Sequence, residues 1–287
     1  MNHPQIAVFA RSATENTTYL RSIEGQKSLL GRTMHDLGFD AIHDEIVVTS
    51  ALAQAILTFR GAANGEEAPI RSIQGDKTHI RGLGVTAAVG KVTVDPEHNE
   101  IVIANGDNTI LVFDRLAQGN VAPKRILGGP DTQLKLSGAS GTCVRTDPIH
   151  NLLLVPTGGI AGGRVLIFDR DASGNTPPRA VIQGPVAMGN QFEVYAPQLR
   201  LVSYPHGSNI EIWKIPLNGV STEPPLKIPA PVGRGGNTET GIVLDPLHKE
   251  VIIATAAGNS IMTFSVPEVY DEWPAAHPVT STNSAQK

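Results

Sequence analysis

The chain has 287 residues, of which 40% are hydrophobic and 17% are charged, and it contains 29 glycines, 21 prolines and one cysteine. The single cysteine excludes an intrachain disulfide and a zinc site built on cysteine pairs. A net charge of −4 without a basic tract argues against a nucleic acid as partner. No apolar run approaches the roughly 18 residues of a membrane-spanning helix, so a membrane is not expected as a partner either.

The N-terminal residues enter a strand pattern at once. Residues 1–5 lack the basic start and the long apolar core of a signal peptide. We therefore expect a soluble cytoplasmic protein, or a secreted one if an export signal has been removed. Residues 6–24 then contain two short apolar runs, at 6–9 and 19–23, with no strand pattern before them.

A short apolar motif, Ile/Val-x-x-Phe/Trp, recurs about every 50 residues along the chain. A repeat of this length made of short β-rich runs is typical of a propeller or an array, in which each unit buries its apolar face on the next. The six copies of the motif lie at residues 6–9, 56–59, 110–113, 165–168, 210–213 and 261–264.

Each repeat unit reads as four short strands, most clearly at residues 91–129. Gly119 and Asn120 mark a hairpin turn, because both tolerate positive φ, and Pro123 suits an edge strand. Four strands joined by tight turns form a meander, and a ring of such sheets is a β-propeller. The predicted strands of this unit are residues 91–95, 100–104, 109–114 and 123–127.

The turn between the first and second strands carries an Asp-x-x-His motif in four units and a degenerate copy in a fifth. We interpret the motif as turn chemistry, because aspartate and proline start turns. The alternative is a metal site formed by four histidines at equivalent positions. The copies begin and end at Asp40 and His43, Asp95 and His98, Asp147 and His150, Asp245 and His248, and Tyr195 and Gln198.

Five first strands thus accompany six third strands, and the unmatched third strand lies at the N-terminus. We predict an all-β protein, a single propeller of five four-stranded antiparallel blades, whose ring residues 6–24 close by joining the C-terminal blade. A sixth, incomplete blade is the alternative. The propeller is expected to span residues 1–272, and residues 273–287 form a polar tail or hold one last edge strand near 276–280.

Two stretches of the sequence resemble bacterial NHL-type β-propeller repeats. They are residues 113–120 with 123–130, and residues 168–175 with 178–185. The resemblance covers nearly the whole chain and implies the propeller fold. Proteins of this broad type include binding scaffolds, peptide-amidating lyases, lactonases and antibiotic lyases, so it leaves the activity open.

Charged residues break the repeat on the predicted innermost strands. One and three residues before the turn aspartate, the side chains are mostly apolar, as packing positions of an alternating strand. Two and four residues before it, they differ from blade to blade and include Asp36, Lys91, Arg145 and Glu193. These charges form either an ion-pair network, since buried charges need partners, or a ligand site, since perturbed charges gather in functional clefts.

The loops before the first strands and those between second and third strands should open on one face of the ring, where scaffolds usually carry their binding sites. Cys143, two residues before Arg145, is either a reactive thiol beside a cation or a small buried filler. The polar candidates in these loops are His35, His79, Arg81, His206, Arg234 and Glu239.

Two functions fit these observations. The first is a scaffold that binds a small molecule or a partner's loop in a polar axial funnel, through Asp36, Arg81, Lys91, Arg145, Arg234 and Glu239. The alternative is a hydrolase, lactonase or lyase at the same funnel, although no nucleophile motif is present. Its catalytic candidates are His35, His79, His206 and Glu193, and Glu193, Asn190, Asp36 and Glu239 would offer oxygen ligands to Ca²⁺ or another divalent metal.

Overall fold

The computed structural model of the chain describes residues 4–31, 34, 36–50, 52–81, 91–136, 142–157, 163–184, 191–205, 209–231, 240–255 and 260–273. The regular elements in these ranges are β-strands and short 3-10 turns, without an α-helix. The described part of the chain accordingly offers no helix of the length and apolar character needed to span a bilayer.

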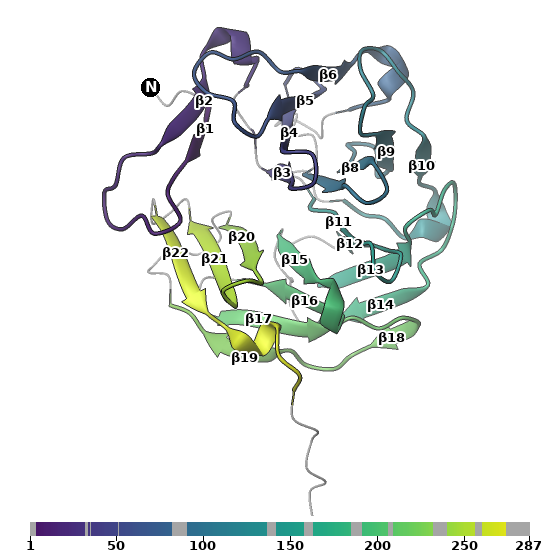
Figure 1. Cartoon of the computed structure of the whole chain (residues 1–287). Helices are drawn as coiled ribbons and strands as arrows, with labels where there is room; N and C mark the ends of the chain where they lie inside the picture. The colour runs from purple at the N-terminus through teal and green to yellow at the C-terminus, as the bar shows by residue number, and fades with distance from the viewer. Residues whose placement is uncertain are drawn as a thin grey trace, which may run out of the picture.

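Five antiparallel sheets follow one another along the chain and stand around a common axis (Figure 1). The first contains β3 (Leu37–Asp40), β4 (Glu45–Ser50), β5 (Ala55–Arg60) and β6 (Arg71–Gln74). The second contains β7 (Val92–Asp95), β8 (Glu100–Ala104), β9 (Ile110–Asp114) and β10 (Arg125–Leu127). The third contains β11 (Arg145–Asp147), β12 (Leu152–Thr157), β13 (Arg164–Asp169) and β14 (Ala180–Gln183). The fourth contains β15 (Phe192–Tyr195), β16 (Arg200–Ser203), β17 (Asn209–Lys214) and β19 (Leu226–Pro229). The fifth contains β20 (Thr240–Asp245), β21 (Glu250–Thr255) and β22 (Ser260–Ser265).

The first strand of each sheet lies innermost, and neighbouring first strands contact one another. β3 lies beside β7, β7 beside β11, β11 beside β15, and β15 beside β20. The strand boundaries of the second sheet differ by no more than two residues from those predicted for residues 91–129. The prediction of an all-β ring of five blades is confirmed, because local alternation and turn chemistry define each meander.

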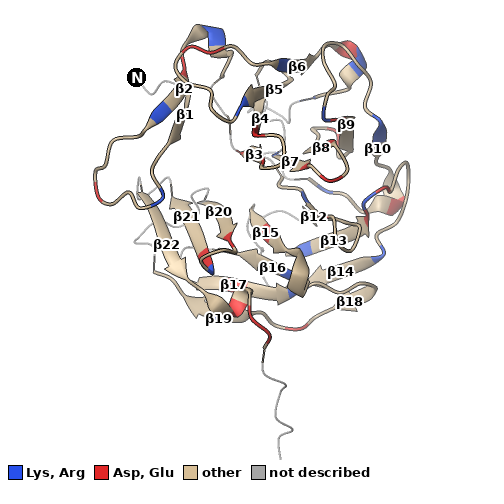
Figure 2. Ribbon diagram, in the orientation of Figure 1, with Lys and Arg blue, Asp and Glu red and all other residues tan. Residues whose placement is uncertain are grey.

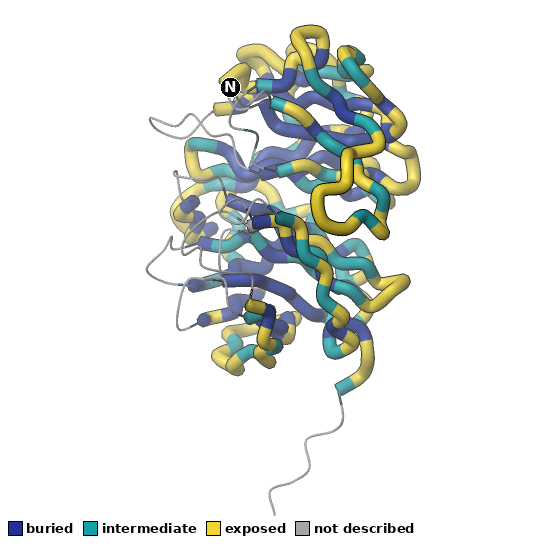
Figure 3. Tube along the Cα trace, turned by 90° about the vertical axis from the view of Figure 1, so that its left-hand side faces the viewer, coloured by how far each residue is buried: buried dark blue, intermediate teal, exposed yellow. Residues whose placement is uncertain are grey.

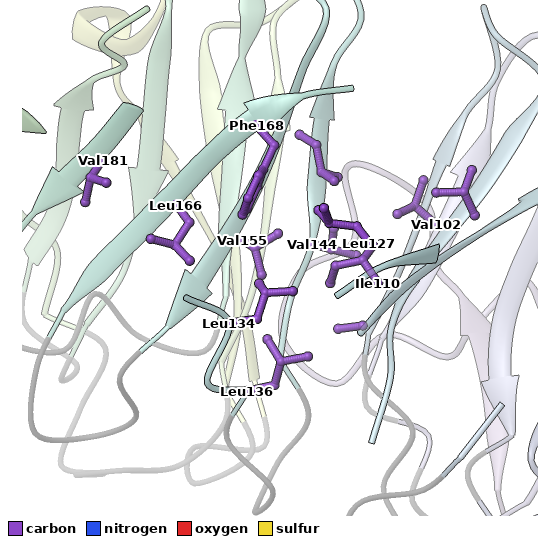
Figure 4. Packing of buried hydrophobic residues seen from close by; sticks show 13 residues of the cluster. Val102, Ile110, Leu127, Leu134, Leu136, Val144, Val155, Leu166, Phe168 and Val181 are labelled. Carbon is purple, nitrogen blue, oxygen red and sulfur yellow. The ribbon is translucent and has the colours of Figure 1, made fainter. Parts of the chain in front are cut away.

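The hydrophobic core is divided into clusters that lie between successive blades. One cluster joins the second and third blades, and its side chains interdigitate from the two facing sheets (Figure 4). Figure 3 shows the buried segments along the strands and the exposed ones at the turns. The cluster labelled in Figure 4 includes Val102, Ile110 and Leu127 from the second blade and Val155, Leu166 and Phe168 from the third.

A second set of contacts ties the outer strands of the first three blades to the next blade. Ile73 bridges in parallel to Gly119, and Leu127 to Gly174, while β14 pairs with β18 (Gly219–Ser221) from the fourth blade. Gly119 and Gly174 have φ values of 77° and 63°, a backbone conformation that favours glycine. Short 3-10 turns lie after outer strands, at a blade hairpin and after β22: η1 (Gln26–Ser28), η2 (Asp76–Thr78), η4 (Pro130–Thr132), η6 (Ala196–Gln198) and η7 (Pro267–Val269).

The N-terminal strands close the ring between the fifth and first blades, but not by extending the fifth sheet. β1 (Gln5–Val8) and β2 (Arg21–Glu24) form a two-stranded sheet of their own. Ile23 bridges to Gly65 of the first blade, and Arg11 binds Asp245, at 3.1 Å, and Glu250 of the fifth. The expected addition to the C-terminal blade is therefore replaced by a half-blade that bridges both neighbours.

The predicted C-terminal tail begins at a packed residue. The indole Nε1 of Trp273 donates a hydrogen bond of 2.8 Å to the carbonyl of Glu268, and the Arg200 guanidinium lies 4.6 Å from the centre of its ring. Residues 274–287, including the predicted edge strand, lie outside the described residues.

Candidate functional site

Of the four charged residues predicted on the inner strands, Arg145 contacts two, Glu193 and Asp36. Its Nε donates a 2.9 Å hydrogen bond to Glu193 of the fourth blade, and its Nη1 lies 3.2 Å from the carboxylate of Asp36, which precedes β3 of the first blade. Nη1 also donates to the carbonyl of Val144 at 2.9 Å. Arg145 therefore connects its own blade with the next one and with one two blades away. We call Asp36, Arg145 and Glu193 the axial cluster.

The axial cluster is largely withdrawn from water, but its members differ. The side chain of Arg145 is 9% exposed and that of Asp36 11%, whereas Glu193 keeps 21%. Burial disfavours the Arg145 cation, yet the carboxylates of Glu193 and Asp36 outweigh it and hold the pKa of Arg145 well above its usual range. Burial, together with the Asp36 charge, raises the pKa of Glu193 against the opposing effect of Arg145.

Lys91 and Cys143 lie just before the innermost strands of the second and third blades. Lys91 is 1% exposed, and its backbone N–H donates to the carbonyl of Thr142 at 3.1 Å. Burial raises the pKa of the Cys143 thiol, although Arg145 and Lys91 favour the thiolate. Because Cys143 is also fully buried, it is a packing residue rather than a reactive thiol.

Two loop candidates, His79 and Arg81, lie on the rim of a shallow pocket of roughly 450 Å³ that Gln54, Gln74 and Asp76 also line. Both side chains are exposed, and in the described part of the chain neither contacts the axial cluster. The remaining loop candidates lie outside the described residues: His35, His206, Arg234 and Glu239, with Asn190.

The backbone beside this pocket is held by Asn105, which the sequence did not single out. Asn105 is fully buried; its Nδ2 donates to the carbonyl of His79 at 3.0 Å, and its Oδ1 accepts from the N–H of Arg81 at 2.7 Å. A polar residue directly after a strand is common, so its sequence carried no distinctive signal. The residue positions His79 and Arg81 relative to the second blade.

The repeated Asp-x-x-His motif forms one hydrogen-bonded turn per blade. In the third blade the Nδ1 of His150 lies 2.9 Å from Asp147, whose other oxygen accepts the N–H of His150 at 2.9 Å. The first, second and fifth blades repeat this arrangement. The turn interpretation is confirmed, and each histidine is engaged by the aspartate of its own turn instead of converging with the others on a metal.

Carboxylates gather both in the fifth blade and in the axial cluster, and a cation already lies in each of these places. In the fifth blade, Asp245, His248 and Glu250 bring ligand atoms within 4.8 Å of one another, but Arg11 binds both carboxylates. In the axial cluster, Arg145 lies between the two acids in the same way. Neither set fits a divalent metal, because the arginine supplies the positive charge that the metal would bring.

A further ion network links the blades near their outer strands. Glu100 of the second blade is 3% exposed on its side chain and contacts Lys124 at 3.0 Å and Arg125 at 2.7 Å. Arg170, from the third blade, binds the same carboxylate at 2.7 Å. Figure 2 shows that positively and negatively charged residues are interspersed over the strands and the rim of the ring. The network is an inter-blade tie rather than a ligand site.

Comparison with known proteins addresses the fold. No protein-family model matches the chain, and no curated protein matches it. A chain described as part of the mitotic checkpoint complex matches with a TM-score of 0.55 and 15% identity, over 88% of this chain and 66% of that one, slightly less than two thirds of its length. The fold is a β-propeller.

A second solved structure supports the same assignment. The β-propeller domain of Cps50 (Swd1) from Myceliophteria thermophila matches with a TM-score of 0.53 and 10% identity, over 86% of this chain and 73% of that one. Identities this low establish the propeller architecture alone, because one fold serves many functions.

Proposed function

We propose that this propeller is a scaffold that binds a polar small molecule or a loop of a partner protein at the axial cluster. The observation that carries the proposal is Arg145, which reaches from the third blade to acids of the first and fourth blades. These charges interrupt the repeat at the axis, and Glu193 remains partly exposed. Perturbed pKa values in a cluster of charges favour a functional role.

The chemistry of the cluster suggests which ligands fit. Arg145 supplies hydrogen-bond donors, and Glu193 and Asp36 supply acceptors within hydrogen-bond distance of it. The charge of Lys91 acts in the same region, since it favours the thiolate of Cys143. The four formal charges sum to zero. A ligand that carries both a donor and an acceptor group, such as a zwitterion or a peptide loop, can bind the carboxylates and the arginine at the same time. Neither charge of the ion pair is then left unpaired.

Protein partners are supported by the structural neighbours. One neighbour is, by its description, a chain of the mitotic checkpoint complex, so a propeller of this general architecture is compatible with assembly into a protein complex. The NHL-type character of the repeats remains a proposal that rests on residues 113–130 and 168–185. The enzyme alternative has no described histidine in contact with Glu193 or Asp36, and nothing in the described residues favours it.

The test is a thermal-shift screen of the whole chain with free amino acids, dipeptides, simple amines and simple carboxylates. We expect zwitterions and dipeptides to raise the melting temperature of the wild type, and Arg145→Met and Glu193→Gln to lose this rise. Arg179→Met is the matched control, because it removes an arginine from an exposed pair with Asp169. If no probe shifts the wild type, or if the axial variants melt lower yet respond as the wild type does, the cluster is structural.

A further inference from the structure

The position between the fifth and first blades holds only half of a blade. β1 and β2 correspond to the third and fourth strands of the other blades, because Ile6 pairs with Ile23 as Ile56 pairs with Ile73. In the first four blades, a second strand pairs with the other edge of the third strand. Figure 1 shows β1 and β2 at the rim, farther from the centre than β3 and β20. In the described residues this position has no inner pair of strands, and we call it the half-blade site.

One wall of the half-blade site is the first blade. Ile6 and Ile23 of the half-blade pack in one cluster with side chains of β4 and β5, but they leave the innermost strand uncovered. Leu37 is 45% exposed and Phe39 56%. Both share a face with the covered side chains, because cross-strand partners point the same way. At the position of Leu37, the second, third and fourth blades instead bury Val92, Val144 and Phe192, which are at most 1% exposed.

The opposite wall is the fifth blade. Val243 on β20 is 53% exposed and Ile261 on β22 is 61% exposed. Val243 lies two residues from Asp245 and therefore on the face that Arg11 of the half-blade contacts. In the register of the sheet, Ile261 belongs to this face as well. Both walls are therefore apolar, and each continues an interface that the half-blade already makes.

A charge pattern in the repeat indicates what belongs between these walls. In the first and second blades, an arginine opens the fourth strand and binds the glutamate that opens the second strand of the same blade. Arg71 binds Glu45, and Arg125 binds Glu100 through two hydrogen bonds of 2.7 Å. The third blade lacks both members, because it begins these strands with Leu152 and Ala180.

The half-blade has the arginine without the glutamate. Arg21 opens β2 in the tripeptide Arg-Ser-Ile, which is repeated at residues 71–73. Its Nη2 donates to the carbonyl of Gly61, and among the described residues it meets no carboxylate. The strand that would carry this carboxylate is also the one that would pair with the inner edge of β1.

We propose that the half-blade site receives a β-hairpin from a partner protein. The hairpin would pair with the inner edge of β1 and cover Leu37 and Phe39 on one side and Val243 and Ile261 on the other. An acidic residue at the start of its second strand would bind Arg21. Strand addition to an open edge is an established mode of peptide recognition. This surface shares no residue with the axial cluster, so the inference goes beyond the proposed function.

Other occupants fit the pattern less well. Residues 274–287 contain no aspartate or glutamate, and Val279 is their only large apolar residue, so they do not match two apolar walls and Arg21. In a second copy of the chain, the inner hairpins that would fit are already paired within its own blades. The occupant with the required chemistry is therefore an acidic, apolar hairpin of another protein.

A suitable probe exists within the protein itself. Residues 91–104 form the inner hairpin of the second blade and carry Glu100. This segment would be fused ahead of Met1 of the full chain through a flexible Gly/Ser linker, which places it at a roughly millimolar effective concentration. Hydrogen exchange of β1 and β3 and the melting temperature are then compared between fused and unfused chains.

We expect the fused hairpin to slow exchange of β1 amides roughly tenfold or more and to raise the melting temperature. Glutamine in place of the glutamate of the added hairpin, or Arg21→Gln in the host, should remove most of the protection, and Phe39→Lys should abolish it. A scrambled hairpin of the same composition is the control. No protection, or equal protection by the scrambled segment, overturns the proposal.

Two measurements on the unfused chain test the competing occupants. If truncation after residue 273 speeds exchange in β1 and β3, the chain's own C-terminus fills the site and the proposal is wrong. If the chain sediments as a dimer that Phe39→Lys dissociates, a second copy fills it, and the proposal is wrong again. A monomer whose exchange is unchanged by truncation leaves the site open to a partner, as proposed.

Discussion

Replacing Glu100 with glutamine tests how strongly charge pairs hold adjacent blades together. The carboxylate is buried and receives hydrogen bonds from Lys124, Arg125 and Arg170, the last from the neighbouring blade. The substitution keeps the shape of the side chain and removes its charge. Three cations then lose their common partner, and removing one partner of a buried pair is strongly destabilising.

The expected magnitude follows from the pKa of Glu100. Burial by itself would raise this pKa, but the hydrogen bonds from Arg125 and Lys124 outweigh burial and lower it from 4.5 to about 2. At about 1.4 kcal/mol for each factor of ten in proton affinity, the ionised carboxylate contributes about 3 kcal/mol to the free energy of unfolding. Because the folded pKa lies below the unfolded one, this contribution is complete above pH 4.5 and is lost as the pH falls towards 2.

Urea unfolding of the wild type and Glu100→Gln from pH 7 to pH 3 measures this difference. We expect the variant to be less stable by about 3 kcal/mol at pH 7, and to melt about 6 °C lower. The difference should shrink to less than half by pH 3, because Glu100 is then protonated in the unfolded chain but still mostly ionised in the folded one, so unfolding is favoured by proton uptake. Glu67→Gln, in an exposed pair with Arg60, is the matched control and should change little. A loss below about 1 kcal/mol at pH 7, or one that is constant down to pH 3, would refute the reasoning.

Three further predictions concern packing and closure. Phe59→Ala should lower the free energy of unfolding by about 3–5 kcal/mol, because Phe59 is fully buried. Phe39→Ala should lower it by less than about 1 kcal/mol, because Phe39 is more than half exposed. Equal losses in urea titrations would contradict the half-blade geometry. Deleting residues 1–25 should lower the melting temperature by more than about 10 °C, since it uncovers the first blade and frees the fifth; an unchanged melting curve would mark them as a dispensable tail. Cys143 should react with a thiol reagent at pH 8 only as fast as the protein unfolds, because burial raises its pKa, and rapid labelling of the native protein would contradict this.

Part of the candidate site is readable from the sequence because it interrupts a repeat. Asp36, Arg145 and Glu193 stand at positions that differ from blade to blade, so the alternation of the strands is enough to place them on or beside the inner strands. Their pairing is not readable in this way, because the partners of Arg145 lie 109 and 48 residues away. Which blades face each other across an axis depends on ring size and closure, which no local pattern encodes.

The same contrast holds for the N-terminus. The motif at residues 6–9 identified a third strand without an inner pair. The pattern allowed two modes of closure: joining the C-terminal blade, which we predicted, and an incomplete sixth blade, the alternative. The contacts of Arg11 with the fifth blade and of Ile23 with the first decided between them. Arg21 shows the limit most clearly, because its tripeptide is identical to residues 71–73 and only the structure reveals that it meets no carboxylate among the described residues.

By itself, the sequence determined the four-stranded unit, the five inner strands and the turn in each blade, since alternation and turn chemistry act between residues close together in the chain. The tertiary structure alone decided that the N-terminal strands form a separate half-blade, that one arginine links three blades, and that apolar side chains remain uncovered at the closure. These features depend on which distant segments become neighbours, and that is set by packing sheets around a closed ring.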